Sequence, residues 1–115
     1  MTVTLFHNPR CSKSRQTLEL LRNRGLEPTI IEYLKTPPSA GQLADLLDKL
    51  GLEPRALMRR SEAAYREAGL DNPALDRDTL IQAMVTHPVL IERPIVVVNG
   101  KAAIGRPPEN VLSIL

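Results

Sequence analysis

The sequence predicts a single α/β domain over residues 1–115, with a four-stranded mixed β-sheet flanked by helices. Two β-rich apolar runs enclose a helical stretch near the N-terminus, and two more flank an Asn-Gly pair near the C-terminus. Between these halves lies a helical insertion of about 50 residues, so the predicted order is a βαβ unit, the insertion and a ββα ending. A chain of 115 residues, 43% of them hydrophobic, is long enough for one core and too short for two.

The N-terminal segment predicts the βαβ unit. Alternating side chains predict a strand that ends at about Phe6, and an apolar stripe predicts a helix from about Ser12 to Arg24. Gly25 follows, where a left-handed residue commonly ends a helix. The run Thr29–Leu34 is rich in β-branched residues and predicts a second strand. A strand, a helix and a strand within about 35 residues describe a right-handed crossover with parallel strands.

The insertion begins with a capping box. Ser39 and Gln42 have the spacing at which the serine accepts from the backbone and the glutamine reaches back. The apolar residues that follow lie on one face of a helix, which Gly51 closes. They are Leu43, Leu46, Leu47 and Leu50.

Shorter helices complete the insertion. One has Pro54 in its first turn, and another runs from about 62 to 68. A longer helix is capped by Asp76 or Asp78. It ends at His87, because a proline follows and disfavours helical geometry at the residue before it.

The C-terminal segment predicts a β-hairpin and a helix. Asn99-Gly100 lies between the apolar runs Ile95–Val98 and Lys101–Ile104, and this pair favours a type I′ turn between antiparallel strands. Pro107-Pro108 ends the hairpin, and Glu109–Leu115 predicts a final helix. The complete element order is typical of the thioredoxin-like architecture.

The single cysteine marks the candidate site. Cys11 lies where the first strand passes into the first helix, and free N–H groups and the helix dipole favour a thiolate there. Arg10, Lys13 and Arg15 add positive charge, and such surroundings lower a cysteine pKa to roughly 3.5–7.5. The alternative is a small buried core residue, but the polar flanks of Cys11 argue against it. Pro9 holds the preceding residue extended and ends the strand.

Two polar residues near Cys11 are further candidates. Ser14 lies three residues later on the same helical face, where its hydroxyl can donate to a thiolate. Cys11 and Ser14 have the spacing of a Cys-x-x-Cys motif whose second thiol has become a hydroxyl. His7 lies four residues before Cys11 and has two interpretations. It is either an imidazolium that lowers the thiol pKa or a hydrogen-bonded structural histidine.

Composition excludes several classes of function. Fifteen Lys and Arg against thirteen Asp and Glu give a net charge of +2, and three aromatic residues offer no platform for stacked bases, so we expect no nucleic-acid partner. No apolar run is long enough to span a membrane and no signal peptide is evident, so we expect a cytoplasmic protein. We also expect a monomer, although no sequence feature fixes the oligomeric state. No metal-ligand spacing or nucleotide motif is present, so we expect no bound cofactor. A redox cycle through one cysteine needs a thiol from another molecule.

Several short motifs follow one another along almost the whole chain. The motifs are His7-Asn8-Pro9-x-Cys11-x-x-Ser14-Arg15, Glu27-Pro28-Thr29-Ile30-Ile31, Tyr33-Leu34-x-Thr36-Pro37-Pro38, Arg55-Ala56-Leu57-x-Arg59, His87-Pro88, Arg93-Pro94-Ile95-Val96-Val97 and Arg106-Pro107. In this order they resemble the glutaredoxin-dependent arsenate reductases and their short paralogues. The resemblance implies a thioredoxin-like fold and a cis peptide bond before Pro94.

The resemblance also implies a mechanism. Cys11 attacks arsenate, glutathione reduces the adduct as co-substrate, and glutaredoxin resolves the mixed disulfide. His7, Ser14 and Arg15 accompany Cys11 in the catalytic motif. The oxyanion is held by three arginines, whose forked and permanently charged donors match a tetrahedral anion. These are Arg59, Arg93 and Arg106.

Two departures from the family pattern leave three functions open. Ser12-Lys13 replaces the usual Gly-Thr, and the chain ends at Leu115 without the C-terminal extension of many such enzymes. The first function is arsenate reduction, and the second is another glutathione-dependent reductase or transferase on the same fold. The third is a non-catalytic regulator that binds RNA polymerase. Ser14 argues against the third, because such regulators typically use a Cys-x-x-Cys switch.

Overall fold

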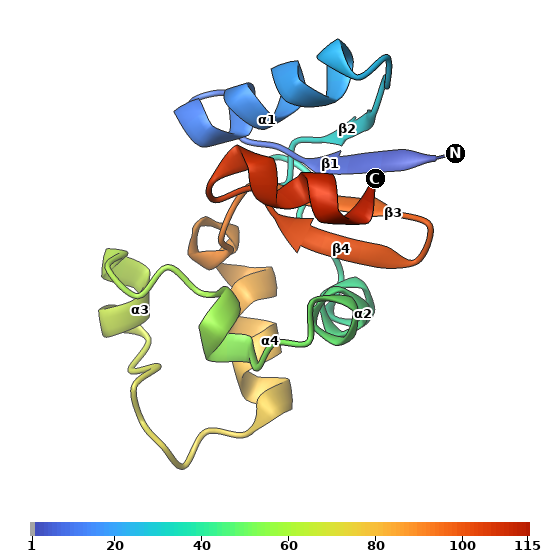
Figure 1. The fold of residues 1–115 in the computed structure, drawn as a ribbon. Helices are drawn as coiled ribbons and strands as arrows, with labels where there is room; N and C mark the ends of the chain where they lie inside the picture. The colour runs from blue at the N-terminus through green and yellow to red at the C-terminus, as the bar shows by residue number, and fades with distance from the viewer. Residues whose placement is uncertain (1) are drawn as a thin grey trace. The chain divides into compact units, whose positions relative to one another are not determined.

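The computed structural model describes residues 2–115, so Met1 lies outside it. Two compact units can be distinguished along the chain. The sheet unit comprises the residues up to Thr36 together with Arg93–Leu115, and the helical unit comprises Pro37–Glu92 (Figure 1). The helical unit therefore corresponds to the predicted insertion between the βαβ and ββα halves.

The sheet unit contains the predicted four-stranded mixed sheet. Its strands are β1 (Val3–Phe6), β2 (Thr29–Ile31), β3 (Ile95–Val98) and β4 (Lys101–Ile104), in the order β2-β1-β3-β4. β1 is parallel to β2, and β3 is antiparallel to both β1 and β4. Helix α1 (Ser12–Asn23) connects β1 to β2 and completes the βαβ unit (Figure 1).

One face of this sheet forms the core of the unit. Val3 and Leu5 stand opposite Val98 and Val96, so their side chains emerge on the same face. Leu21 of α1 and a residue of the C-terminal 3-10 helix η3 (Pro108–Ile114), Val111, pack against them. All six side chains are at most 4% exposed. Burial of each contributes roughly 1.5–3 kcal/mol and fixes α1 against the end of β1.

The C-terminal hairpin follows local sequence rules. Asn99 and Gly100 have φ angles of 52° and 75°, as a type I′ turn requires, and Val98 stands opposite Lys101. The predicted hairpin is confirmed.

Several predicted boundaries differ from the structure. β2 ends at Ile31 rather than Leu34, because the N–H groups of Lys35 and Thr36 donate to the Glu32 carbonyl and form a turn. The first helix ends at Asn23 rather than Arg24, within the fraying of a helix end. The final helix is η3 rather than an α-helix over 109–115. The tighter 3-10 geometry is common in short segments of this kind.

The helical unit contains α2 (Ala40–Leu50), η1 (Pro54–Leu57), α3 (Ala63–Glu67), α4 (Arg77–Thr86) and η2 (Pro88–Leu90). Helix α4 packs against α2, η1 and η2. The apolar side chains that these elements bury include Leu43, Leu46, Leu47, Leu57, Tyr65, Leu80, Ile81, Met84 and Leu90. None of the helices among the residues described has the length and apolar character to cross a bilayer.

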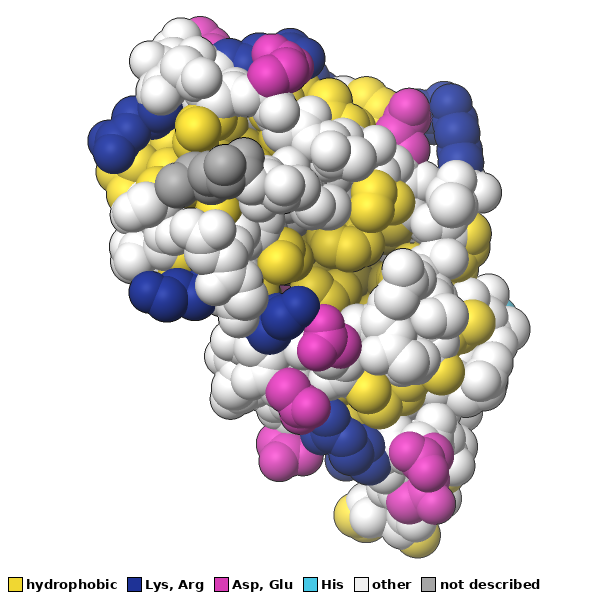
Figure 2. Space-filling model, turned by 90° about the vertical axis from the view of Figure 1, so that its right-hand side faces the viewer, with side chains coloured by type: hydrophobic (Ala, Val, Ile, Leu, Met, Phe, Trp, Pro, Cys, Tyr) yellow, Lys and Arg dark blue, Asp and Glu magenta, His cyan; other side chains and the backbone are white. Residues whose placement is uncertain are grey.

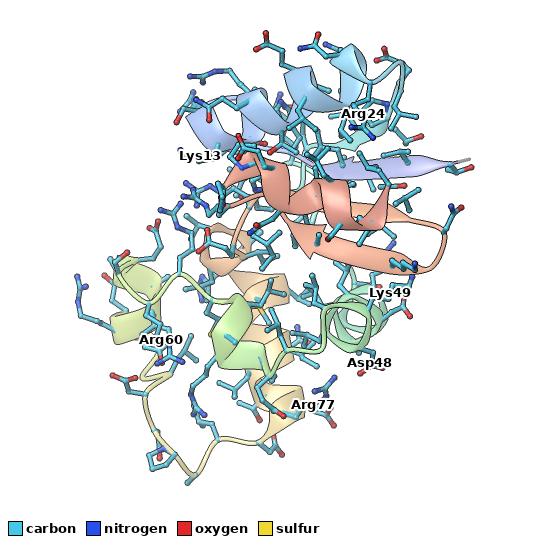
Figure 3. The ribbon with its side chains drawn as sticks, viewed as in Figure 1. Lys13, Arg24, Asp48, Lys49, Arg60 and Arg77 are labelled. Carbon is cyan, nitrogen blue, oxygen red and sulfur yellow. The ribbon has the colours of Figure 1, made fainter. Side chains whose placement is uncertain are left out.

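The caps of the two longer helices confirm the prediction. Ser39 Oγ accepts from the Gln42 N–H (3.1 Å) and Gln42 Oε1 accepts from the Ser39 N–H (2.8 Å). Of the two aspartates proposed for α4, Asp76 is the cap, because its carboxylate accepts from the Thr79 N–H at 2.8 Å. Arg77 Nη2 then donates to Asp48 Oδ1 (3.3 Å) and links α4 to α2 (Figure 3).

Charges of both signs are intermixed on the surface. On the face drawn in Figure 2, Lys and Arg alternate with Asp and Glu, and neither sign forms an extended patch. This distribution agrees with the small net charge and gives no electrostatic footprint for a nucleic acid on that face.

Gly105 connects the sheet to α1, and its substitution tests this packing. A Cβ at Gly105 would lie 2.5 Å from Thr17 Oγ1 and 2.8 Å from Pro94 Cγ. At exposed Gly41 in α2 a Cβ would meet only Ser39 Oγ, at an ordinary contact distance of 3.9 Å. We expect Gly105→Ala to lower the free energy of unfolding by about 1–3 kcal/mol through overpacking. Gly41→Ala is expected to raise it by about 0.5 kcal/mol. Denaturant titration of both variants measures this difference, and equal stabilities would contradict the packing described.

Candidate active site

Cys11 is the N-cap residue of α1. Its backbone is extended (φ −91°, ψ 122°), and its residue surface is 9% exposed. The Cys11 N–H donates to the Asn8 carbonyl (2.9 Å), and the Cys11 carbonyl accepts from the Arg15 N–H (3.0 Å). The first bond closes a tight turn after β1, and the second is the first hydrogen bond of α1. The thiol is therefore carried at the positive end of the α1 dipole, which favours the thiolate.

Arg106 donates a hydrogen bond to the Cys11 thiol. The distance from Nη2 to Sγ is 3.5 Å, and Nε of the same guanidinium donates to the Arg93 carbonyl at 2.7 Å. The second bond orients the guanidinium fork, so that a permanent positive charge is directed at the sulfur. The structure thus brings two of the predicted arginines to Cys11 in different ways. Arg106 acts through its side chain, and Arg93 contributes its backbone carbonyl.

The peptide bonds that precede the two prolines in this region are both cis. The bond Arg93–Pro94 is cis, as the family resemblance implied, and Arg106–Pro107 is also cis. The second cis bond was not expected from the sequence.

His7 and Ser14 form a buried hydrogen-bonded pair beneath the cysteine turn. His7 Nδ1 lies 2.6 Å from Ser14 Oγ, and Ser14 Oγ also accepts from the Asn8 N–H at 3.1 Å. Ser14 is 0% exposed and His7 is 6% exposed. In the neutral tautomer that carries its proton on Nε2, Nδ1 accepts the hydroxyl proton of Ser14. The structure therefore gives the Ser14 hydroxyl partners other than the thiol.

Burial decides between the two interpretations of His7. It lowers the pKa of His7 below the ordinary 6.5; the negative charge of Glu32 opposes this shift, and Arg15 reinforces it. The lowered pKa favours the neutral ring. This state favours the hydrogen-bonded histidine over the imidazolium that would act on the thiol by charge.

Further hydrogen bonds fix the loop that carries Cys11. Arg15 Nη1 donates to the Pro9 carbonyl (2.9 Å), so this exposed arginine holds the loop from outside. Asn8 Oδ1 accepts from the Arg10 N–H (3.0 Å), and Asn8 is 9% exposed. Sequence reasoning did not select Asn8, although an asparagine before a proline at a strand end is a recognised turn signal.

Arg59 belongs to the helical unit and is held there by two carboxylates. Its Nη1 lies 3.8 Å from Glu62 Oε1, and its Nε lies 4.0 Å from Glu92 Oε1. The side chain of Arg59 is 23% exposed, whereas the neighbouring Arg60 is exposed (Figure 3). The two arginines thus differ in environment. The short helix expected to carry both of them ends at Leu57, so they lie in the chain that follows η1 (Pro54–Leu57).

Metal ligation is not a feature of this site. Within residues 2–115, no group of three or more His, Cys, Asp or Glu side chains is placed to hold a metal ion. The chemistry available to the described residues is that of a cysteine sulfur with the Arg106 guanidinium directed at it.

The sequence and the fold both match known proteins. A model of the ArsC family matches residues 6–114. The chain is 53% identical over 114 residues to an arsenate reductase of Neisseria meningitidis, covering 98% of this chain and 97% of that protein. It is 48% identical over 113 residues to an arsenate reductase of Escherichia coli, covering 98% of this chain and 80% of that protein. The solved structure of an arsenate reductase from Vibrio cholerae superposes with a TM-score of 0.98 at 55% identity, covering 100% of this chain and 98% of that chain.

The fold and the site define a thioredoxin-like α/β protein with a cysteine at the start of its first helix. Together with the family match, these relatives show that the chain belongs to the ArsC family. The family and the fold predicted from the sequence are both confirmed.

The lowered pKa of His7 predicts a pH-dependent stability. Between the folded and unfolded pKa values of His7 the unfolded chain binds more protons, so the free energy of unfolding falls as pH drops below about 6.5. We expect the wild-type protein to lose stability between about pH 7.5 and about pH 5.5, and His7→Gln to lose less. Denaturant titrations at the two pH values measure the difference.

The control for this measurement is the other histidine of the chain. His87 is exposed, so His87→Gln should retain the wild-type pH dependence. Identical pH dependence in all three proteins would show that the folded protein does not keep His7 neutral.

Proposed function

We propose that this protein reduces arsenate to arsenite, with Cys11 as nucleophile, glutathione as co-substrate and glutaredoxin as the partner that regenerates the thiolate. The observation that carries the proposal is the hydrogen bond from Arg106 Nη2 to Cys11 Sγ at the N-terminus of α1. Arsenate reductase is also the activity named for the Neisseria and Escherichia relatives.

The first step joins sulfur to arsenic. A lone pair of the Cys11 thiolate forms an S–As bond, and one As–O bond breaks as its oxygen leaves as hydroxide or, after protonation, as water. Negative charge then accumulates on the remaining oxygens of the adduct. A guanidinium already directed at the sulfur is placed to stabilise that charge, with little reorganisation during the reaction.

The second step transfers two electrons to arsenic. The thiolate of glutathione attacks Cys11 Sγ, an S–S bond forms, and the S–As bond breaks with its electron pair remaining on arsenic, which leaves as arsenite. Glutaredoxin then takes the glutathionyl group by thiol–disulfide exchange, and Cys11 returns to the thiolate. Because the chain has one cysteine, both thiols that complete the cycle come from outside it.

The other predicted site residues receive roles of two kinds. His7, Ser14 and Arg15 are positioning residues, because their hydrogen bonds hold the loop around Cys11. Arg93 and Arg59 are proposed to bind the oxyanion with Arg106. For Arg59 this role is supported by the sequence resemblance.

The proposed setting is the cytoplasm, where reduced glutathione is abundant and isolated thiols stay reduced. The proposed working form is a monomer whose two units act as one domain. Its small net charge and its mixture of surface charges support neither a nucleic-acid nor a membrane partner.

A second candidate function is supported by Lys13. This residue stands in the first turn of α1, half-buried, where many family members have no positive charge (Figure 3). A lysine beside the thiol favours acidic ligands larger than an oxyanion, so the second candidate is another glutathione-dependent reductase or transferase. Activity towards arsenate distinguishes the two candidates.

Site variants test the proposed function. In an assay of arsenite formation with glutathione and glutaredoxin, we expect no turnover from Cys11→Ser. We expect a fall of about 100-fold in kcat for Arg106→Ala, because one stabilising donor is lost. Arg59→Ala is expected to lower kcat/KM for arsenate at least about tenfold, since an anion loses one charge-assisted contact.

Matched arginines serve as controls. Arg24 lies at the opposite end of α1 from Lys13, and Arg60 adjoins Arg59 (Figure 3). Arg24→Ala and Arg60→Ala should both retain near-wild-type kinetics. If wild type forms no arsenite while Cys11 still reacts with glutathione conjugates, arsenate reduction is wrong and the second candidate replaces it.

A further inference from the structure

A pocket lies beside the loop that carries Cys11, and the mechanism above does not use it. Its volume is about 300 Å³, and we call it the loop pocket. Its lining residues are His7, Asn8, Pro9, Arg10, Glu32, Leu34 and Lys35. We propose that the loop pocket binds glutathione, the zwitterionic tripeptide thiol that reduces the Cys11 adduct. This inference rests on the proposed function and assigns a location to its co-substrate.

The loop pocket has the position that ligand sites take in α/β folds. Both lining segments directly follow parallel strands, one after β1 and the other after β2. The His7 N–H donates to the Ile31 carbonyl at 2.8 Å, which holds the two segments together where the strands end. Crevices beyond the carboxyl ends of parallel strands are the usual binding sites of such sheets.

The loop pocket ends one residue before the cysteine. Arg10 lines the pocket and immediately precedes Cys11, which is not itself a lining residue. A tripeptide bound in the pocket would therefore have to extend its thiol past Arg10 to attack Cys11 Sγ.

The charges of the loop pocket match those of glutathione group for group. Arg10 and Lys35 are basic and Glu32 is acidic, whereas glutathione at neutral pH carries two carboxylates and one ammonium. Lys35 Nζ and Glu32 Oε1 pair with each other at 3.5 Å, with side chains 78% and 41% exposed. Exposed pairs of this kind contribute about 0–1 kcal/mol, so ligand groups can replace them at small cost.

An apolar wall gives the pocket a second kind of contact. Leu34 is 43% exposed and stands beside Pro9, which is also exposed. The methylene groups of a peptide can pack against such a wall, whereas a compact tetrahedral oxyanion has no apolar surface that would do so. Glu32 would in addition repel a dianion. The lining thus favours a peptide-like zwitterion over arsenate itself.

Steady-state kinetics test the loop pocket. We expect Lys35→Glu to raise the KM for glutathione about tenfold relative to the KM for arsenate. The reason is that Lys35 attracts a carboxylate of glutathione, whereas a glutamate at this position repels it. Lys101→Glu makes the same change of charge at an exposed position of β4 and should leave both KM values near wild type. Equal KM ratios in the two variants would overturn the proposal.

A binding measurement separates this inference from the proposed function. S-methylglutathione lacks a free thiol, so its binding can be followed without turnover. Titrated into the isotopically labelled protein, it should shift the amide signals of His7, Asn8, Arg10 and 32–35, and Lys35→Glu should weaken these shifts about tenfold. Absent shifts, or shifts located elsewhere, would overturn the proposal.

The remaining outcomes are also decisive. Binding in the loop pocket without any arsenite formation would refute arsenate reduction and retain the glutathione site. Arsenite formation without such binding would refute the glutathione site alone. If reduced glutaredoxin shifts these amides and S-methylglutathione does not, the loop pocket is a protein-docking surface and the proposal is wrong.

Discussion

The hydrogen bond between Arg106 and the Cys11 thiol joins residues 95 positions apart, and the rest of the sheet unit makes it possible. Pairing of β1 with β3 places Phe6 opposite Ile95, so the chain before β3 runs past the end of β1. The β3–β4 hairpin then returns Arg106 to the same edge, where the Arg93 carbonyl holds its Nε. The central strands therefore direct the guanidinium at a thiol that α1 carries.

Buried polar residues form a second set of contacts at the same turn. The chain passes from β1 to α1 within a few residues, and this abrupt change buries polar groups that need partners. The Ser14 hydroxyl hydrogen-bonds with His7 Nδ1 and accepts from the Asn8 N–H, and Arg15 donates to the Pro9 carbonyl. These hydrogen bonds hold the loop against the start of α1, where its N–H groups lie near the sulfur.

Local rules account for the parts of the fold that the sequence predicted. The turn at Asn99-Gly100, the capping box of Ser39 and the place of Cys11 at a helix start each depend on a few neighbouring residues. The contacts of Arg106 and the pairing of Arg59 with Glu92 depend on tertiary packing, which no periodicity encodes. The predicted partner of the Ser14 hydroxyl differed for the same reason, because helical spacing alone ignores the strand that brings in His7.

The ultraviolet absorbance of the thiolate at neutral pH measures how far Arg106 stabilises it, with Cys11→Ser as the blank for all other groups. We expect Arg106→Gln to lose most of the wild-type signal and Arg24→Gln to retain it, because Arg106 is the arginine that donates to Sγ. Equal signals in the wild type and Arg106→Gln would show that the guanidinium does not stabilise the thiolate, and would leave the helix terminus as the main source of that stabilisation.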